Sequence, residues 1–284
     1  MKTRRANRTE TDSPGLLRWK AVRWGESAPE EGFVVVEAPL EVAVGDHLIA
    51  VLMQTPGMEK ELGIGYCLGE GILPSAEAIA AVDVEKGTDT PLRVVIRPHS
   101  SDALAVDALH EPRLIRSGCG SNAAGSWGCT LPPLGQGITV TDAALQRSMK
   151  TLAASQEAYR VAGGIHAAGV FTSDGEAVVV CEDIGRHNTV DKAMGHCILA
   201  GIPLADKFLL GTGRASYEFV TKSARMSVSL VASLSSPTSL SVSLADVLNQ
   251  TLVGYLRSNR FIIYTHPWRV QTAAASMRGV RPAD

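Results

Sequence analysis

From Gly163 onward, short apolar segments alternate with amphipathic segments of about ten residues, and this alternation limits the folds open to the chain. Short apolar runs predict strands, and apolar residues at helical spacing predict helices. Strands that alternate with helices predict a layered α/β domain with a largely parallel sheet. The expected strands are 168–171, 177–181, 207–210, 228–232, 251–256 and 261–265, and the expected helices are 188–199, 217–226 and 237–248.

The first two strands flank Asp174-Gly175, a dipeptide typical of hairpin turns. Before Gly163 we expect two short strands in 33–44 interrupted at Pro39, a helix in 60–73 ending near Gly71, a strand in 92–98 and a helix in 142–158.

The expected organisation is a frayed N-terminus (1–18), a smaller α+β region (19–115), a mobile loop carrying Cys119 (116–134), the α/β domain (135–270) and a C-terminal tail (271–284).

Composition excludes several classes of protein. The 284 residues carry a formal net charge of -2, so no global field recruits nucleic acid or an anionic membrane. The longest uncharged run, 226–245, contains eight Ser and a Pro and is too polar to span a membrane. Arg4-Arg5 is not followed by an apolar segment, which argues against export. Five cysteines form no disulfide framework, so we expect a cytoplasmic protein.

Two segments have the pattern of an anion-binding helix start. In LLGTGRASYE, Gly211 and Gly213 allow backbone N–H groups to approach an anion, and Arg214 adds a charge beside Ser216. A plain strand-to-helix turn is an equal alternative. In SSPTSL, residues 235–240, we expect Ser236 to be the N-cap and the following Pro to be the first helical residue, with the Thr238 hydroxyl nearby. Here an ordinary capped helix is the simpler interpretation. Both helix starts are expected at the same sheet edge.

A third candidate is CEDIGRHNTVDK, residues 181–192, where polar groups follow a strand. His187 and Arg186 beside two carboxylates can form a tuned, partly buried network, whereas the alternative is a solvated loop with a helix cap. His166 is equally compatible with a core histidine and with a catalytic one, and the same caution applies to His266.

Cys119 differs from the other cysteines because it lies between glycines in an uncharged loop. Arg116 favours its thiolate form, which makes a reactive thiol one of two open interpretations. Asn122 occupies the fourth position of a C-x-x-C motif, which argues against zinc and dithiol redox chemistry, while Cys129 remains a candidate partner. The remaining cysteines lie in apolar surroundings and are expected to be buried and inert: Cys67, Cys181 and Cys197.

Together these segments resemble the formate dehydrogenase accessory sulfurtransferase family, FdhD, from about Val36 to His266. The segments that carry the resemblance are EAPL (37–40), RSGCGS (116–121), GGIHAAGVF (163–171), EDIGRHNTVDK (182–192), GRASYE (213–218), SSPTSL (235–240) and FIIYTH (261–266). The resemblance implies a cytidine-deaminase-like three-layer α/β/α domain, a smaller N-terminal α+β region and a homodimer. Zinc deaminases need H-x-E and P-C-x-x-C, and neither motif is present, so we expect no protein-bound zinc and no deaminase chemistry.

The resemblance further implies that the chain is a sulfurtransferase. It would accept sulfur from a cysteine desulfurase as a persulfide on Cys119. It would pass this sulfur to the bis(molybdopterin guanine dinucleotide) molybdenum cofactor, which formate dehydrogenase then receives. A guanine nucleotide is expected to mimic this bound substrate. The implied cofactor-binding residues are Phe261, Ile262, Ile263, Tyr264, Thr265 and His266, and we add Arg214, Ser216, Ser236, Thr238 and His187.

The sequence departs from the family in one respect, because Asn122 replaces the second cysteine that many members carry. A single persulfide-bearing thiol can still transfer sulfur. The departure keeps an alternative open, in which the chain is a chaperone that binds the molybdenum cofactor without persulfide chemistry.

Overall fold

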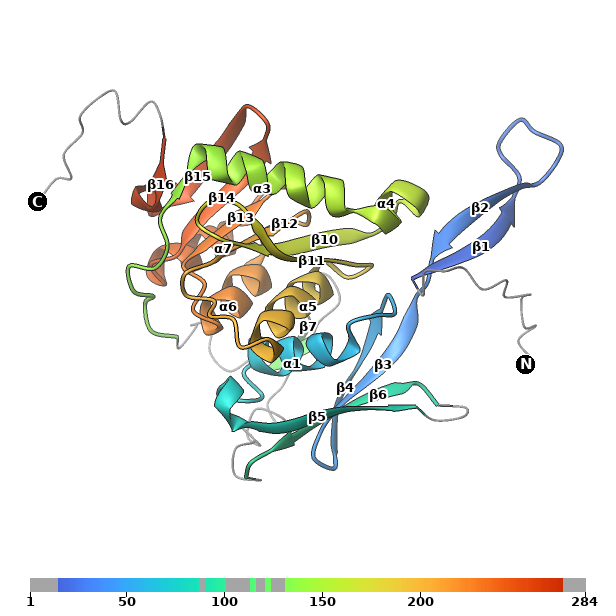
Figure 1. Ribbon diagram of the computed structural model, residues 1–284, viewed down its shortest axis with the longest axis horizontal. Helices are drawn as coiled ribbons and strands as arrows, with labels where there is room; N and C mark the ends of the chain where they lie inside the picture. Colours follow the sequence, from blue (N-terminus) through green and yellow to red (C-terminus); the bar gives the residue numbers. More distant parts are fainter. Residues whose placement is uncertain (1–14, 87–89, 101–112, 116–120, 124–130, 273–284) are drawn as a thin grey trace, which may run out of the picture.

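The computed structural model describes residues 15–86, 90–100, 113–115, 121–123 and 131–272. A six-stranded sheet with helices on both faces forms the larger part, and a four-stranded sheet packs against it through one helix (Figure 1). The α/β class expected from the alternating pattern is confirmed.

The six-stranded sheet has the strand order β11-β10-β12-β13-β14-β15. Its strands are β10 (His166–Phe171), β11 (Ala177–Asp183), β12 (Phe208–Gly211), β13 (Leu230–Ser233), β14 (Thr251–Arg257) and β15 (Arg260–Thr265). Only the pairs β12–β13 and β13–β14 are parallel, and the other three pairs of neighbouring strands are antiparallel, so the expectation of a largely parallel sheet is wrong. The reason is that β10 and β11, and likewise β14 and β15, are joined by connections too short to cross the sheet, which forces antiparallel pairing.

The turn between β10 and β11 confirms the hairpin expected from Asp174-Gly175. Gly175 has a φ of +78°, and a Cβ at this position would lie 2.2 Å from the carbonyl oxygen of Ala144. Arg147 donates a hydrogen bond of 2.9 Å to the carbonyl of Asp174. The turn therefore needs glycine both for its backbone conformation and for its close packing on the neighbouring helix.

Helices cover both faces of this sheet. They are α5 (Arg186–Leu199), α6 (Tyr217–Arg225) and α7 (Ser239–Val247) on one face and α3 (Asp142–Ser155), followed by α4 (Glu157–Ala162), on the other (Figure 1). The single helix expected over 142–158 ends at Ser155 instead. A separate helix, α4, starts after it because the Glu182 carboxylate accepts hydrogen bonds from the N–H groups of Ala158 and Tyr159, at 2.8 and 2.9 Å.

The smaller sheet has the order β4-β3-β6-β5. Its elements are β3 (Ala38–Val44), β4 (His47–Gln54), β5 (Ile79–Lys86) and β6 (Leu92–Pro98), with the helix α1 (Glu59–Gly69) and the short 3-10 helix η1 (Ala76–Ala78). Pro39 was expected to interrupt a strand, but it lies inside β3. Pairing of β3 with β6 begins only at Leu40, so the missing N–H of Pro39 breaks no hydrogen bond on that side.

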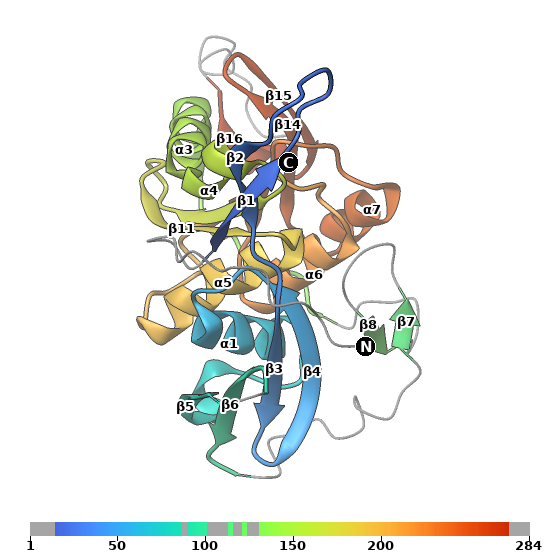
Figure 2. The ribbon, with the colours of Figure 1, turned by 90° about the vertical axis from the view of Figure 1, so that its right-hand side faces the viewer.

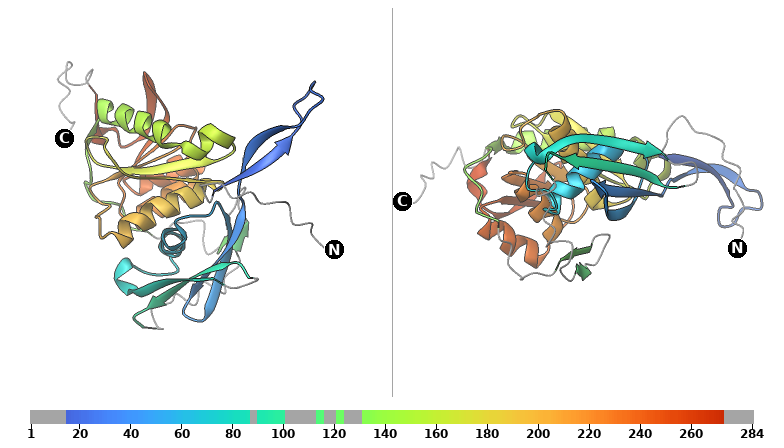
Figure 3. Two further views of the ribbon diagram at one scale, coloured as in Figure 1. Left: turned by 45° about the vertical axis from the view of Figure 1, so that its right-hand side comes forward. Right: turned by 90° about the horizontal axis from the view of Figure 1, so that it is seen from below.

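A two-stranded hairpin, β1 (Leu16–Ala21) with β2 (Glu30–Val35), projects from the body (Figures 1 and 3). β1 begins inside the segment 1–18 that was expected to be frayed. The remaining short elements pair as β7 with β8 and as β9 with β16: β7 (Arg113–Ile115), β8 (Ser121–Ala123), β9 (Val140–Thr141), the 3-10 helix η3 (Pro267–Arg269) and β16 (Val270–Gln271). Among the described residues, no helix is both long and apolar enough to cross a membrane.

The two sheets are joined where α1 crosses α5 (Figure 2). Glycines make the crossing close: a Cβ at Gly65 would lie 2.0 Å from the carbonyl oxygen of Asp191, and one at Gly195 would lie 2.0 Å from that of Glu61. One continuous buried apolar cluster includes residues of the four-stranded sheet, of α1 and of the six-stranded sheet. A second cluster lies on the opposite face, beneath α3.

Candidate functional site

The motif-bearing loops converge at one edge of the six-stranded sheet. The parallel strands β12, β13 and β14 end there. β10 starts there and β11 ends there, because His166 pairs with Asp183 and Ala168 pairs with Gly211. We call this place the candidate edge; it comprises His166 and the segments 183–188, 212–218 and 233–238. Ligands of α/β proteins usually bind at the carboxyl ends of parallel strands.

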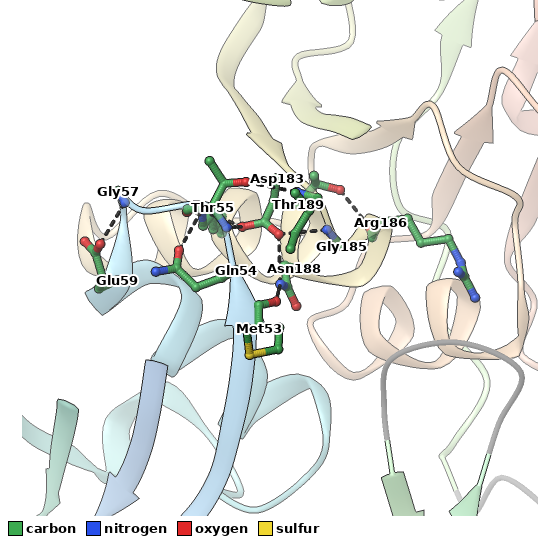
Figure 4. Close-up of polar contacts among 12 residues, drawn as sticks. Met53, Gln54, Thr55, Gly57, Glu59, Asp183, Gly185, Arg186, Asn188 and Thr189 are labelled. Carbon is green, nitrogen blue, oxygen red and sulfur yellow. Dashed lines mark hydrogen bonds and ion pairs between the residues drawn. The ribbon is translucent and has the colours of Figure 1, made fainter. Parts of the chain in front are cut away.

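Asp183 in the third motif is a structural residue. Its side chain is fully buried and accepts hydrogen bonds from the backbone N–H of Thr55 (3.1 Å) and of Gly185 (2.8 Å) and from the Asn188 amide (2.8 Å). Lys192 forms an ion pair with Asp183 at 2.7 Å (Figure 4 shows the surrounding contacts). These groups fix the turn before α5 and attach it to Thr55, which follows β4.

The side chain of Arg186 extends away from this buried cluster (Figure 4). Gly213, in the GRAS segment, approaches its aliphatic stem so closely that a Cβ there would lie 2.8 Å from the Cβ of Arg186. Gly213 therefore allows the loop after β12 to pack against the start of α5.

His187 and Ser216 were both expected near a ligand, and the structure brings them together. The Nε2 atom of His187 lies 3.2 Å from Ser216 Oγ, and its Nδ1 atom lies 2.6 Å from a carboxylate oxygen of Glu218. The His187 and Glu218 side chains are 7% and 5% exposed, while Ser216 is half-buried. Glu218 was not among the site residues expected from the sequence, although it lies two residues after Ser216 in the GRASYE segment.

His166 also lies at the candidate edge and is half-buried. The hydroxyl oxygen of Thr212 accepts a hydrogen bond from the Ala167 N–H at 3.0 Å and lies 3.2 Å from Nδ1 of His166. Burial lowers the pKa of His166, and the charges of Arg186 and His187 lower it further. Both effects favour the neutral form of the His166 imidazole.

The GRAS and SSPT loops are linked by backbone hydrogen bonds. Ala215 N–H donates to the Ser236 carbonyl, and Thr238 N–H donates to the Ala215 carbonyl, both at 3.1 Å. The expectation that Ser236 is the N-cap of the next helix is wrong. Thr238 is the N-cap, because its hydroxyl and that of Ser241 form a reciprocal capping box. Arg214 is exposed, and Ser236 and Thr238 are half-buried, so all three are accessible at the candidate edge.

The segment 261–266 runs across the sheet rather than along the candidate edge, because β15 starts at that edge and ends opposite it. Phe261 and Ile263 pack on the α3 side, while Tyr264 packs against the core beneath α7. Ile262 alternates with these inward residues and is exposed. At the far end, the hydroxyl of Thr265 donates to the Gln250 carbonyl at 2.6 Å. His266 also lies there.

His266 is held at that far end by α7 and a tryptophan. Its Nε2 atom lies 2.9 Å from the carbonyl oxygen of Asp246, in the last turn of α7. Its ring packs edge-on against Trp268, with 4.5 Å between the ring centroids. The structure therefore separates His266 from the group formed by Ser216 and His187.

Tyr255 near the end of β14 was missed by sequence reasoning. It has a φ of +50°, a conformation that is rare for an aromatic residue, and its N–H donates to the Ser235 carbonyl at 3.0 Å. Its side chain is exposed beside the SSPT loop. No local pattern in VGYLRS signals this strain, because it arises from an irregularity in the pairing of β14 with β15.

Cys119 and Cys129 lie outside the described residues. Cys67, Cys181 and Cys197 are buried, as expected. Among the described residues, no group of three or more His, Cys, Asp or Glu side chains could hold a metal ion. A cavity of about 350 Å³ lies at the opposite edge of the sheet, before β12 and β13, where Leu134, Ala205 and Ser229 contribute to its lining.

The fold and the candidate edge together define an α/β protein. Its hydroxyl, imidazole and guanidinium groups gather where helices α6 and α7 start. Comparison with known proteins then assigns the family: the sequence model of the FdhD/NarQ family matches residues 35–271, and the chain belongs to this family. A relative from Variovorax paradoxus (strain S110), named sulfur carrier protein FdhD, is 32% identical over 267 residues, which cover 93% of this chain and 96% of that protein.

A second relative with the same name, from Sulfurisphaera tokodaii, is 33% identical over 259 residues, covering 88% of this chain and 96% of that protein. The fold is shared with a solved structure described as a formate dehydrogenase accessory protein from Desulfotalea psychrophila. The TM-score is 0.69 at 23% identity, covering 90% of this chain and 98% of that chain.

Proposed function

We propose that this protein is a sulfur carrier that transfers persulfide sulfur through Cys119 to the bis(molybdopterin guanine dinucleotide) molybdenum cofactor. The observation that carries the proposal is the similarity, over nearly the whole chain, to relatives named sulfur carrier protein FdhD. The proposed donor is a cysteine desulfurase and the proposed client is formate dehydrogenase. We further propose that the protein acts as a homodimer in the cytoplasm.

Loading of Cys119 is a balanced thiol exchange. The Cys119 thiolate attacks the terminal sulfur of the donor persulfide, a new S–S bond forms, and the donor cysteine leaves as a thiolate. In the second transfer, an electron pair of the acceptor attacks the terminal sulfur and forms the bond between acceptor and sulfur, while the S–S bond breaks and Cys119 leaves as a thiolate. A single cysteine suffices for both steps, so Asn122 in place of a second loop cysteine is compatible with the proposal.

The candidate edge supports binding of the guanine dinucleotide part of the substrate. Arg214, Ser216, Ser236 and Thr238 lie on linked loops at the starts of α6 and α7. Backbone N–H groups at helix starts attract phosphate, and arginine adds a charge that pairs well with phosphate oxygens. We assign the phosphates to this edge and propose that Phe261 and Ile262, at the near end of β15, extend the binding surface.

The test is the intact mass of the protein after incubation with a cysteine desulfurase and cysteine. We expect the wild-type protein to gain one sulfur atom that a reductant removes, and Cys119→Ala to gain none. Cys129→Ala is the matched control and should still gain the sulfur atom.

If the wild type gains no sulfur while a known acceptor is loaded in parallel, the sulfur carrier proposal fails. Retained binding of guanosine diphosphate (GDP) would then favour the alternative, a cofactor chaperone without persulfide chemistry. Asn122 is the observation that favours this second candidate.

A further inference from the structure

Helices α5 and α6 face each other through two polar pairs one turn apart. His187 and Asp191 are four residues apart on α5, and Glu218 and Lys222 are four residues apart on α6, so each pair lies on one helix face. His187 contacts Glu218 at 2.6 Å, and Asp191 contacts Lys222 at 2.6 Å. The four side chains are buried. The first pair continues to the candidate edge through Ser216.

The contact between His187 and Ser216 has two arrangements with different consequences for a ligand. The Glu218 carboxylate accepts a hydrogen bond from Nδ1 of His187 in both. When the imidazole is neutral, Nε2 carries no proton and accepts the hydrogen of the Ser216 hydroxyl. The serine then presents only lone pairs to the edge, which repel an anion.

When the imidazole is protonated, Nε2–H donates to Ser216 Oγ instead. The serine hydrogen is released and can point to a ligand oxygen. If an anion bound while the imidazole stayed neutral, the Ser216 hydroxyl could donate its one hydrogen either to the anion or to Nε2 of His187, but not to both. If it donated to the anion, the lone pair of His187 Nε2 would face the lone pairs of Oγ at 3.2 Å, so an anion at Ser216 favours the protonated imidazole.

We propose that an anionic group of the ligand binds at Ser216 together with one proton, which His187 takes up and Glu218 stabilises. This inference rests on the proposed function, since it assigns the anion to a phosphate of the guanine dinucleotide. It makes His187 and Glu218 positioning residues that act through Ser216.

Charged groups on α5, α6 and β11 lie around His187. Glu218 on α6 is in direct contact and attracts the imidazolium. Asp191, one turn along α5, is attractive at longer range, and Lys222 opposes it while being bound by Asp191 and by Glu70, which follows α1. On β10, burial lowers the pKa of His166, and Arg186, the residue before His187, carries a charge that opposes the uptake. Asp183 of β11 is paired with Lys192 and adds little.

The experiment is calorimetric titration of the full chain with GDP at pH 7.5 in buffers with different heats of ionisation. The dependence of the binding heat on the buffer gives the number of protons taken up. The proton that GDP itself gains or loses is common to all variants, so the readout is the difference between variants. We expect the wild type to take up as much as one proton more than Ser216→Ala and His187→Gln.

The affinity of the wild type should also fall as the pH rises, by up to about tenfold per pH unit beyond the change seen in Ser216→Ala. His196→Gln is the matched control, because it makes the same substitution in the last turn of α5, and it should behave as the wild type. Glu218→Gln should lower the uptake.

Binding of GDP with equal proton uptake in the wild type and Ser216→Ala would overturn this inference and leave the proposed function intact. If the wild type binds no GDP, the assignment of the phosphates to this edge fails, and the inference fails with it. Circular dichroism of each variant shows whether it is folded, and half-buried Ser216 offers a substitution that leaves the buried pair of His187 and Glu218 in place.

Discussion

At the scale of single residues, burial sets the reactivity of the three described cysteines. Burial raises the pKa of the Cys181 thiol to about 12 and that of Cys197 to about 11, and it raises the pKa of Cys67 strongly. At pH 8, a thiol with these values is ionised in only about one molecule in a thousand or fewer. These residues are therefore unsuited to carry a persulfide, which is compatible with the assignment of that role to Cys119.

The expected consequence is selective labelling. With N-ethylmaleimide at pH 7.5, Cys67, Cys181 and Cys197 should stay unmodified in the folded protein and react after unfolding in guanidinium. Peptide mass mapping of the two samples measures this difference. Rapid native labelling of a peptide that contains Cys181 would contradict the burial seen at this strand.

Single residues also show why polar clusters are hard to interpret from sequence. Residues 181–192 were expected to hold either a partly buried polar network or a solvated loop with a helix cap; the structure shows buried polar contacts, and α5 begins after Gly185 without a side-chain cap. Asp183 and Glu182 bind backbone N–H groups and are structural, whereas His187 points toward Ser216. The different roles of Asp183 and His187 depend on their partners, Thr55 and Ser216. These partners are distant in sequence, so the local sequence pattern does not identify them.

At the scale of elements, α1 and α5 cross at close range. We expect Gly65→Ala to lower the free energy of unfolding by about 3 kcal/mol or more, because the added Cβ would lie 2.0 Å from a backbone oxygen that cannot move without shifting α5. Urea denaturation followed by circular dichroism measures the change.

Gly32→Ala is the matched control for this substitution, since a Cβ at Gly32 in β2 would meet no atom within 4 Å. Equal stability of Gly65→Ala and Gly32→Ala would show that the two helices do not cross as closely as described.

Element boundaries were predicted well where the signal is local. The expected helix over 217–226 corresponds to α6, and the Asp174-Gly175 turn is present. The start of α7 was misplaced, because Ser236 and Thr238 are both good N-cap residues by type. The choice between them depends on Ser241, which completes the capping box, and on Ala215 of the neighbouring loop, whose carbonyl accepts from Ser241 Oγ at 2.8 Å.

At the scale of the whole molecule, a buried ionic cluster links the two sheets. Lys222 of α6 binds Asp191 of α5 at 2.6 Å and Glu70, which follows α1, at 3.0 Å. Burial raises the pKa of Asp191 to about 6, opposed by the adjacent lysine. One lysine thus compensates two buried carboxylates that come from different parts of the chain.

We expect Lys222→Met to lower the free energy of unfolding by about 3–5 kcal/mol, because it leaves both carboxylates buried without their cation. Denaturant unfolding monitored by fluorescence and by circular dichroism measures the loss. Lys20→Met is the control: it removes a surface lysine 3.8 Å from Glu31 and should cause no measurable change. A Lys222→Met protein as stable as this control would contradict the described cluster.

The sequence by itself determined the α/β class, most helices and strands, the burial of Cys67, Cys181 and Cys197, and the family, because these depend on local periodicity, turn residues and long motifs. Only the tertiary structure decided that the sheet is mixed, since strand direction depends on how the hairpins β10–β11 and β14–β15 pair with the strands beside them. It also decided that His187, Ser216 and Glu218 meet, while His266 lies at the opposite edge. Such contacts join residues from separate elements, and their partners are set by packing rather than by spacing along the chain.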